Sequence, residues 1–586
     1  MVSTDRAISA TRPPVAPLRA LRRFLSRPAN LLLAAAVLLV LWLVLVPLVA
    51  LFYTTFTEET MFGTGGFTLD NLFEAYKDRH IGLLLWNSLV YAAGSAALTF
   101  LLGTSVAFVV ERTDAPWRGT FHALALLSFA IPGLLTTMAW MLILSPNIGW
   151  VNGILKSLFG VSEAPLNIYT MGGMIWALSS HYFPLAYLLM GPAFRVLDTR
   201  MEEAAVVSGA RSWQIAARVT LPLLRPAILS TLLLLFVRGI ESFEVPRLVG
   251  MPARIKVFTT EIQFATSEAP PHLGVAGALG LTLLAICVIG IYFYRRATAN
   301  ADAYATVTGK GYKPEPLRLG ALRWPVAIAI ALMFFVALGL PLFTLAWQSF
   351  FHNITMPSLK VAGGASLENY RYIFGYPVFL NAIKNSAILG TLAATFVVAL
   401  AFVLSWIVQR SGNRYAWTID ALAFTPVAIP SIIIGCAILF AYLMIPIGVY
   451  NTIWILLIAY VTLFLPYGMR FAASGLSQIH RELEEAAEMS GASAPQIARR
   501  ILVPLLAPVV VSAWLYVFIM AVRELSASVF LVGPGTSVLG TISLTMWTEG
   551  GSYGAICALG IIQIIPLTAI VTVLRWLEQR VRIGRD

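Results

Sequence analysis

The stretch EEAAVVSGARSWQIAARVTLP at residues 202–222 returns in nearly the same form, EEAAEMSGASAPQIARRILVP, at residues 484–504. Of the 24 aligned positions from Glu203 to Pro226, 14 are identical at a fixed offset of 282. Each copy is a small polar module that lies between two long apolar stretches. The repeat therefore predicts a chain built from two equivalent halves.

The composition outside the repeat is typical of a membrane protein. Of the 586 residues, 59% are hydrophobic and 12% are charged, whereas soluble proteins devote about 25% to charge. Residues 28–57 contain no charged side chain, and roughly 20 apolar residues suffice to span a bilayer as a helix. This run is longer than the apolar core of a signal peptide, so we expect it to stay in the mature chain.

Apolar runs bounded by charged residues predict twelve transmembrane helices. They are expected near residues 31–54, 83–110, 119–144, 167–194, 222–246, 273–294, 325–349, 380–408, 417–445, 452–475, 504–530 and 553–575. Most of the 40 Lys and Arg residues fall in the N-terminal tail, in alternate loops and at the C-terminus. Because positively charged loops stay inside, both termini are expected to face the cytoplasm.

Further matching residues bring the two halves into register. Asn87-Ser88 matches Asn385-Ser386 and Pro132 matches Pro430 at an offset of 298, while Pro184 matches Pro466 at 282. Six spans per half give both halves the same orientation. The predicted fold class is an all-α polytopic membrane protein with two parallel six-helix repeats and a pathway between them. The predicted segments are a cytoplasmic tail 1–30, a first domain 31–296, a cytoplasmic linker 297–323, a second domain 324–576 and a cytoplasmic tail 577–586.

Each module is predicted to form two short helices on the cytoplasmic surface, joined at a glycine. Gly209 and Gly491 lie where a helix end often needs positive φ, and Ser212 can cap the second helix. A docking surface for a protein partner is one interpretation. An amphipathic helix that only anchors the loop in membrane lipid is the other. The alanine-rich face and the duplication favour docking.

The spacing E-A-A-x-x-x-G, followed by I or V near L-P, resembles the EAA signature in permease subunits of binding-protein-dependent ABC importers. The second copy departs from it only in having Val503 before the proline. The matching residues are Glu203, Ala204, Ala205, Gly209 and Ile215 in loop 196–221 with Pro222 directly after it, and Glu485, Ala486, Ala487, Gly491 and Ile497 in loop 478–503 with Pro504 directly after it.

This resemblance implies a multi-pass permease of the bacterial inner membrane. In the family, the loop is a coupling helix that sits in a cleft of a cytoplasmic ATPase. Two loops imply two ATPase copies, together with an extracytoplasmic solute-binding protein. The resemblance also implies no cofactor on this chain, since ATP and Mg²⁺ are used by the partner.

Two fused copies resemble the iron(III)-type permeases within this group, as do the stretches 241–262 and 523–547. Ferric iron is therefore the expected cargo, held by the external protein. Thiamine, polyamine and phosphonate remain alternatives.

Several other chemistries are excluded by what the sequence lacks. It contains no G-x-x-x-x-G-K-[ST], so we expect no ATPase site and no enzyme activity of its own. Its six His and three Cys residues are scattered without metal-ligand spacing. The net charge of +12 is spread over loops, so nucleic acid is not an expected partner.

Charged residues near the ends of the fifth and eleventh spans are candidates for gating or for lining the pathway. They are Arg238, Glu241, Glu244, Arg523 and Glu524. An ionisable group inside a membrane costs about 2.5–3.5 kcal/mol or more, so it normally pairs or lines a cavity. Arg238 and Glu241 are three residues apart and can instead form a structural ion pair. The prolines in the spans can likewise be kinks or hinges.

Two other classes of protein remain as alternatives. A secondary transporter driven by an ion gradient can also have twelve spans in parallel halves. It would be expected to carry a charged motif after the second span of each half, but those loops are short here. A membrane scaffold without transport activity gives no reason for duplicated docking loops.

Overall fold

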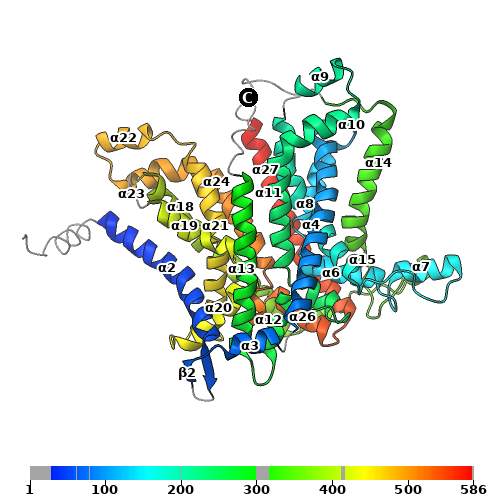
Figure 1. Cartoon of the computed structure of the whole chain (residues 1–586), viewed down its shortest axis with the longest axis horizontal. Helices are drawn as coiled ribbons and strands as arrows, with labels where there is room; N and C mark the ends of the chain where they lie inside the picture. The colour runs from blue at the N-terminus through cyan, green and yellow to red at the C-terminus, as the bar shows by residue number, and fades with distance from the viewer. Residues whose placement is uncertain are drawn as a thin grey trace, which may run out of the picture.

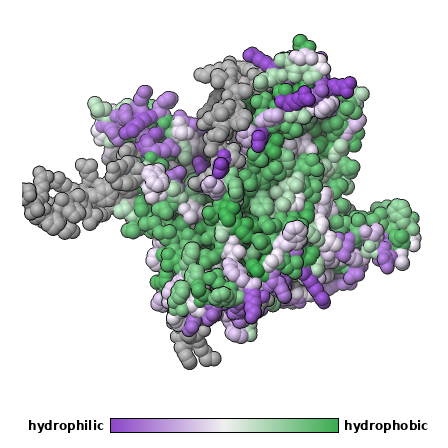
Figure 2. All heavy atoms as spheres, in the orientation of Figure 1, coloured by the Kyte–Doolittle hydropathy of each residue, from purple (hydrophilic) through white to green (hydrophobic). Residues whose placement is uncertain are grey.

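The structure is a computed structural model that describes residues 28–60, 63–77, 80–197, 200–298, 316–410 and 416–583. Most of the predicted N-terminal tail 1–30 and of the predicted linker 297–323 lies outside these ranges. Figure 1 shows an upright bundle of long helices with short helices at both ends. Figure 2 shows a broad apolar band between two more polar ends, as expected for a bundle that spans a bilayer.

The first half contains six predicted spans and several short elements. The spans correspond to α2 (Pro28–Thr55), α4 (Ile81–Arg112), α5 (Arg118–Ser128) with α6 (Gly133–Leu144), α8 (Met171–Val196), α11 (Leu221–Ile240) and α13 (Leu273–Thr298). The short elements are β1 (Thr57–Thr60), β2 (Gly63–Phe67), α3 (Asp70–Lys77), α7 (Trp150–Phe159), α9 (Arg200–Val207), α10 (Ser212–Ile215), η1 (Ala216–Thr220), η2 (Pro246–Gly250) and α12 (Phe258–Ser267). Strands β1 and β2 pair as one antiparallel hairpin.

The second half repeats the order of the spans. Its spans are α14 (Arg323–Phe334) with η5 (Phe335–Gly339) and α15 (Leu340–Gln348), α18 (Pro377–Arg410), α19 (Ala416–Phe424) with η6 (Thr425–Ala428) and α20 (Ser431–Met444), α21 (Ile453–Leu476), α24 (Val503–Arg523) and α27 (Tyr553–Ile583). The short elements are η4 (Gly320–Leu322), α16 (Leu359–Ala362), α17 (Glu368–Gly375), α22 (Glu482–Met489), α23 (Ala494–Ile497), η7 (Ala498–Leu502), α25 (Ser528–Leu531) and α26 (Leu539–Thr548). Helix α27 continues to Ile583, past the predicted domain end at 576.

The predicted count of twelve spans is not confirmed. Within the described ranges, nine helices are long and apolar enough to cross a membrane, or eleven if each of two bent pairs is counted as one span. The remaining predicted span corresponds to α8, which has 26 residues. Its length is sufficient, but its middle carries Ser179, Ser180, His181 and Tyr182, so its composition is too polar for the same test.

Two of the predicted proline positions mark sharp breaks rather than gentle kinks. Helices α5 and α6 meet at 101°, and α19 with η6 meets α20 at 105°. Pro132 and Pro430 stand immediately before the second helix of each pair. Pro184 and Pro466, in contrast, lie inside the continuous helices α8 and α21. Both breaks occur at the same place in the two halves.

The first helix of each half packs against the other half. Helix α2 lies along α20 and α19, where the indole of Trp42 donates to the hydroxyl of Tyr442 at 2.9 Å. Helix α14 packs against α5 and α4, and the ring of Phe334 stacks on that of Phe121 with centroids 5.9 Å apart. Figure 1 shows α2 and α14 on opposite sides of the bundle. This exchange joins the two halves into one apolar core.

Glycines allow close packing of the central helices within each half. A Cβ on Gly103 of α4 would lie 2.8 Å from the backbone nitrogen of Tyr187 in α8. A Cβ on Gly468 of α21 would lie 2.7 Å from Cγ1 of Val397 in α18. Small residues of this kind let membrane helices approach closely. The pairs α4–α8 and α18–α21 therefore form the rigid centre of each half.

Candidate functional site

The two predicted coupling modules form the same corner in both halves. Helix α9 is followed by Gly209 and α10, and helix α22 is followed by Gly491 and α23. Both glycines have φ of 81°, and a Cβ added to either would meet no other atom. The backbone angle alone therefore requires glycine, and the predicted positive φ is confirmed.

The hydrogen bonds at the two corners are also the same. In each copy the residue after the glycine donates five residues back and the glycine donates three residues back, which is the Schellman pattern of a helix end. The bonds are Ala210 to Ala205 at 3.0 Å and Gly209 to Val206 at 2.9 Å, then Ala492 to Ala487 at 3.0 Å and Gly491 to Glu488 at 2.9 Å. Figure 1 shows α9 with α10 and α22 with α23 at the same end of the bundle.

At equivalent positions, each module presents an acidic and an apolar side chain to the exterior. Glu203 and Glu485 are exposed. One helical turn later, Val207 is 89% exposed and Met489 is 90% exposed. Ala204 and Ala486 are exposed, whereas Ala205 and Ala487 are half-buried. Large apolar side chains exposed in this way are typical of protein or membrane contacts.

The other residues of the EAA pattern hold the module to the bundle. Ile497 is buried in a small cluster with Leu476, Leu502 and Leu506, and Ile215 is half-buried. Pro222 and Pro504 lie in the first turn of α11 and α24, where a missing N–H is tolerated. These residues position the exposed face of the module.

Sequence reasoning missed an ion pair that forms in both halves. Arg112, at the end of α4, pairs with Glu202 at the start of α9. Arg410, at the end of α18, pairs with Glu484 of α22, with Nε and Oε1 2.7 Å apart. The signal was present in the sequence, because each arginine recurs at the offset of 298 and each glutamate at 282.

The five predicted pathway residues converge on one cavity between the halves. The cavity has a volume of about 340 Å³ and is lined by Arg238, Glu241 and Glu244 of the first half and by Arg523 and Glu524 of the second. Both helix breaks also line it, through residues 129–133 and 426–431. Irregular backbone at membrane depth is expected only where it lines a cavity or is buried in protein.

Each arginine of the cavity crosses to the other half. Arg238 pairs with Glu241 at 2.5 Å and donates through Nη2 to the hydroxyl of Tyr467 at 2.6 Å. Arg523 donates to the backbone oxygen of Phe129, which the first helix break leaves available, and its Nη2 lies 3.2 Å from Nε2 of His181. The predicted Arg238–Glu241 pair is therefore present, and it is part of a contact between halves.

The two remaining carboxyl groups have different surroundings. Glu524 accepts a hydrogen bond from the backbone N–H of Ala527 at 2.8 Å. Glu244 lies over Gly133, where an added Cβ would be 2.5 Å from Oε2 of Glu244 and 3.1 Å from Nε2 of His181. The glycine therefore makes room for both side chains at the first helix break.

The repeated Asn-Ser pair tethers a short helix at the opposite end of the bundle from the modules. The hydroxyl of Ser88 accepts from the N–H of Phe258 at 3.1 Å, and Ser386 accepts from Leu539 at 2.8 Å. Each bond gives an acceptor to a backbone N–H in the first turn of α12 or α26, where an N–H has no partner within the helix. The preceding asparagines, Asn87 and Asn385, donate to the loops that lead into these helices.

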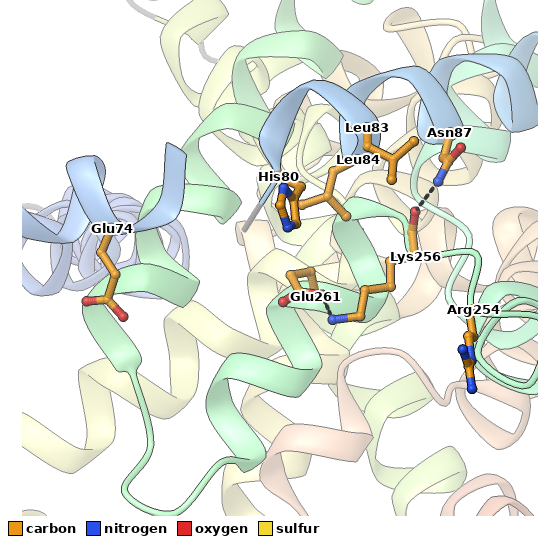
Figure 3. Close-up of a pocket in the computed structure, with 8 residues that line it drawn as sticks. All are labelled: Glu74, His80, Leu83, Leu84, Asn87, Arg254, Lys256 and Glu261. Carbon is orange, nitrogen blue, oxygen red and sulfur yellow. Dashed lines mark hydrogen bonds and ion pairs between the residues drawn. The ribbon is translucent and has the colours of Figure 1, made fainter. Parts of the chain in front are cut away.

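In the first half this tether borders an open pocket of about 390 Å³ (Figure 3). Figure 3 shows the Asn87 amide directed at the backbone oxygen of Lys256, 3.1 Å away, and the Lys256 amine directed at Glu261, 3.0 Å away. The matching tether of the second half uses the carbonyls of Gly535 and Ser537 instead. The charged pocket is thus built on a tether that both halves share.

Comparison with known proteins agrees with this duplicated architecture. Residues 99–298 and 401–583 match the family described as binding-protein-dependent transport system inner membrane component. A relative is the ferric transport system permease protein FbpB of Actinobacillus pleuropneumoniae, 26% identical over 560 residues, covering 94% of this chain and 79% of that protein. Another is the putative ferric transport system permease protein FbpB 1 of Haemophilus influenzae, 25% identical over 512 residues, with coverage of 86% and 78%.

A solved structure with some similarity is a bacterial ABC transporter involved in the import of the acidic polysaccharide alginate. It is 19% identical, with a TM-score of 0.36, and the match covers 44% of this chain and 94% of that chain. The two family matches each include one copy of the repeated module and together exceed half of the sequence. This chain belongs to the family of inner-membrane components of binding-protein-dependent transport systems, and it carries the family's domain twice.

Proposed function

We propose that this chain is the membrane subunit of an ATP-driven importer of ferric iron. An extracytoplasmic binding protein delivers the iron, and two copies of a cytoplasmic ATPase drive its passage. The observation that carries the proposal is the pair of equivalent modules at one end of the bundle, each with an exposed acid and an exposed apolar side chain. Two equivalent surfaces fit two equivalent partners.

The central cavity is the proposed passage. It lies between the halves, and side chains from each half bond across it. It holds three carboxyl groups, Glu241, Glu244 and Glu524, against two guanidinium groups. An excess of acid favours a cationic cargo over an anionic one. Relatives named as ferric transport permeases support iron as that cation.

In this proposal, closure of the ATPase dimer on ATP draws the two modules together. The halves then open toward the outside, the cross-half bonds of Arg238 and Arg523 break, and iron enters the cavity from the binding protein. Hydrolysis returns the halves to the starting state. The chain contributes no ATP site and no cofactor of its own, and both of its ends lie in the cytoplasm with the ATPase.

Uptake into proteoliposomes tests this function. The chain is reconstituted with its ATPase, ATP is enclosed, and binding protein loaded with radioactive iron is added outside. We expect iron accumulation that requires ATP and the binding protein and that survives a protonophore. Accumulation of thiamine, a polyamine or a phosphonate in place of iron would refute the cargo. Uptake that collapses with the proton gradient while ATP persists would refute the ATP-driven mechanism.

A further inference from the structure

We propose that the pairs Arg112–Glu202 and Arg410–Glu484 are the mechanical joints that couple the two modules to the helices α4 and α18. Through these joints, movement of a module at the cytoplasmic end is passed to the far end of the bundle. The inference rests on the proposed function, because it assigns the joints a role in ATP-driven transport. The four side chains are positioning residues that touch neither cargo nor nucleotide.

Equivalence between the halves is the first observation. The glutamate is the residue immediately before the EAA pattern in each copy, and the arginine ends the second long helix in each half. The two members of a pair are 90 residues apart in the first half and 74 residues apart in the second. The end of the long helix and the start of the module therefore form the same ion pair in both halves, although the number of residues between them differs.

Burial separates these pairs from ordinary surface ion pairs. The side chains of Arg112 and Glu202 are 9% and 19% exposed, and those of Arg410 and Glu484 are 15% and 9% exposed. By contrast, Arg481 and Glu485 of the same module are 60% and 58% exposed. Exposed pairs contribute little to stability. Breaking a buried pair leaves an uncompensated charge and is strongly unfavourable, so the buried pairs resist separation.

Each joint also binds a third element. In the first half, Oε1 of Glu202 accepts from the hydroxyl of Thr220 at 2.6 Å, which ties the joint to the start of α11. In the second half, the third element is α21, because Arg410 donates through Nη2 to the backbone oxygens of Leu476, the last residue of α21, and of Ile479 just beyond it. Oε2 of Glu484 also accepts from the indole of Trp406 on α18 at 3.2 Å, which is a second bond to the same helix as Arg410. The module cannot move without carrying these helix ends with it.

The helices beyond the joints lead to the opposite end of the molecule. Helix α4 has 32 residues and α18 has 34, so each is about 48–51 Å long at 1.5 Å per residue. Near the far ends of these helices, Ser88 and Ser386 tether α12 and α26. Each half thus has one continuous helix with the joint at one end and the tether at the other. This is a direct path from the ATPase side to the outer side.

The test uses the whole transporter in proteoliposomes and measures iron uptake and ATP hydrolysis together. The variant Glu202→Gln with Glu484→Gln keeps size and an oxygen acceptor but removes the charge that holds each arginine. We expect ATPase binding and hydrolysis within about twofold of the wild type and a fall of at least tenfold in iron moved per ATP. The exchange Arg112→Glu with Glu202→Arg, combined with Arg410→Glu and Glu484→Arg, should restore at least part of that ratio.

Arg195→Gln is the matched control. Arg195 of α8 pairs with Glu111, next to Arg112 on α4, and the two side chains are 58% and 13% exposed. This pair joins α4 to α8 rather than to a module, so the variant should keep the wild-type ratio. Glutamine variants that couple as well as the wild type would overturn the inference. So would a loss of coupling in the glutamine variants that the exchange fails to restore. A wild-type protein that binds no ATPase or imports without ATP would instead refute the proposed function.

Discussion

Gly209 and Gly491 form the corner between the two short helices of each module. A helix end followed by a second helix needs a residue with positive φ, and glycine was the one candidate at that spacing in both copies. Both have φ of 81°. The ion pairs at Glu202 and Glu484 were not predicted, because the local pattern contains no information about partners 90 and 74 residues away. The available signal was that all four residues recur at the two offsets of the repeat.

Replacing both corner glycines by valine should uncouple transport. A β-branched residue in left-handed backbone conformation costs about 1–2 kcal/mol at each site, and a Cβ at either position would meet no neighbouring atom. We expect insertion to be normal, co-purification of the ATPase to fall and uptake to drop several-fold. The matched variant Gly→Asn tolerates this conformation and should retain uptake. Equal uptake by the valine and asparagine variants would show that the corner geometry does not matter.

The bond between Arg238 and Tyr467 should stabilise the contact between halves. Tyr467→Phe leaves Nη2 of Arg238 without this acceptor, and losing a hydrogen bond to a charged group costs about 1.5–3 kcal/mol. The melting temperature of the purified protein should therefore fall. Tyr516→Phe is the control, since Tyr516 also lines the cavity but the structure gives its hydroxyl no hydrogen bond among the described residues. An equal effect of the two variants would contradict this assignment.

The helices show which features of the fold periodicity and hydropathy can predict. Eleven of the twelve predicted spans pass a test of length and apolar composition, two of them as bent pairs. Helix α8 fails because it contributes His181 and Tyr182 to the cavity and is correspondingly polar. The breaks at Pro132 and Pro430 could not be separated from the continuous helices at Pro184 and Pro466, because proline permits both outcomes.

Removing the Ser386 hydroxyl should loosen the end of the second half that lies opposite the module. In Ser386→Ala, the N–H of Leu539 loses its acceptor in a buried setting, which costs about 1–3 kcal/mol. The melting temperature should fall, and proteolysis near α26 should become faster. Ser512→Ala removes an exposed hydroxyl that bonds within its own helix, and it should change neither value. A Ser386→Ala protein with wild-type stability would argue against the tether.

The packing of α2 and α14 against the opposite half could not be predicted from the sequence. Both helices are apolar on all sides, so their sequences do not indicate which helices they contact. This packing makes the assembly of the halves depend on contacts between helices rather than on the linker.

A chain divided between residues 298 and 316 should therefore assemble when both parts are co-expressed. A tag on one part should recover the other, whereas each part alone should be degraded. Stable, separately purified halves would contradict the exchanged packing.

Site-specific photo-crosslinking from residues 207 and 489 during transport would show whether the two modules dock on the ATPase. A crosslinker placed at Val207 or Met489 lies on the exposed face of each module. We expect both positions to crosslink to the ATPase subunit, with a yield that changes when ATP is added. Crosslinks to lipid alone, with no ATPase product while iron uptake continues, would contradict it.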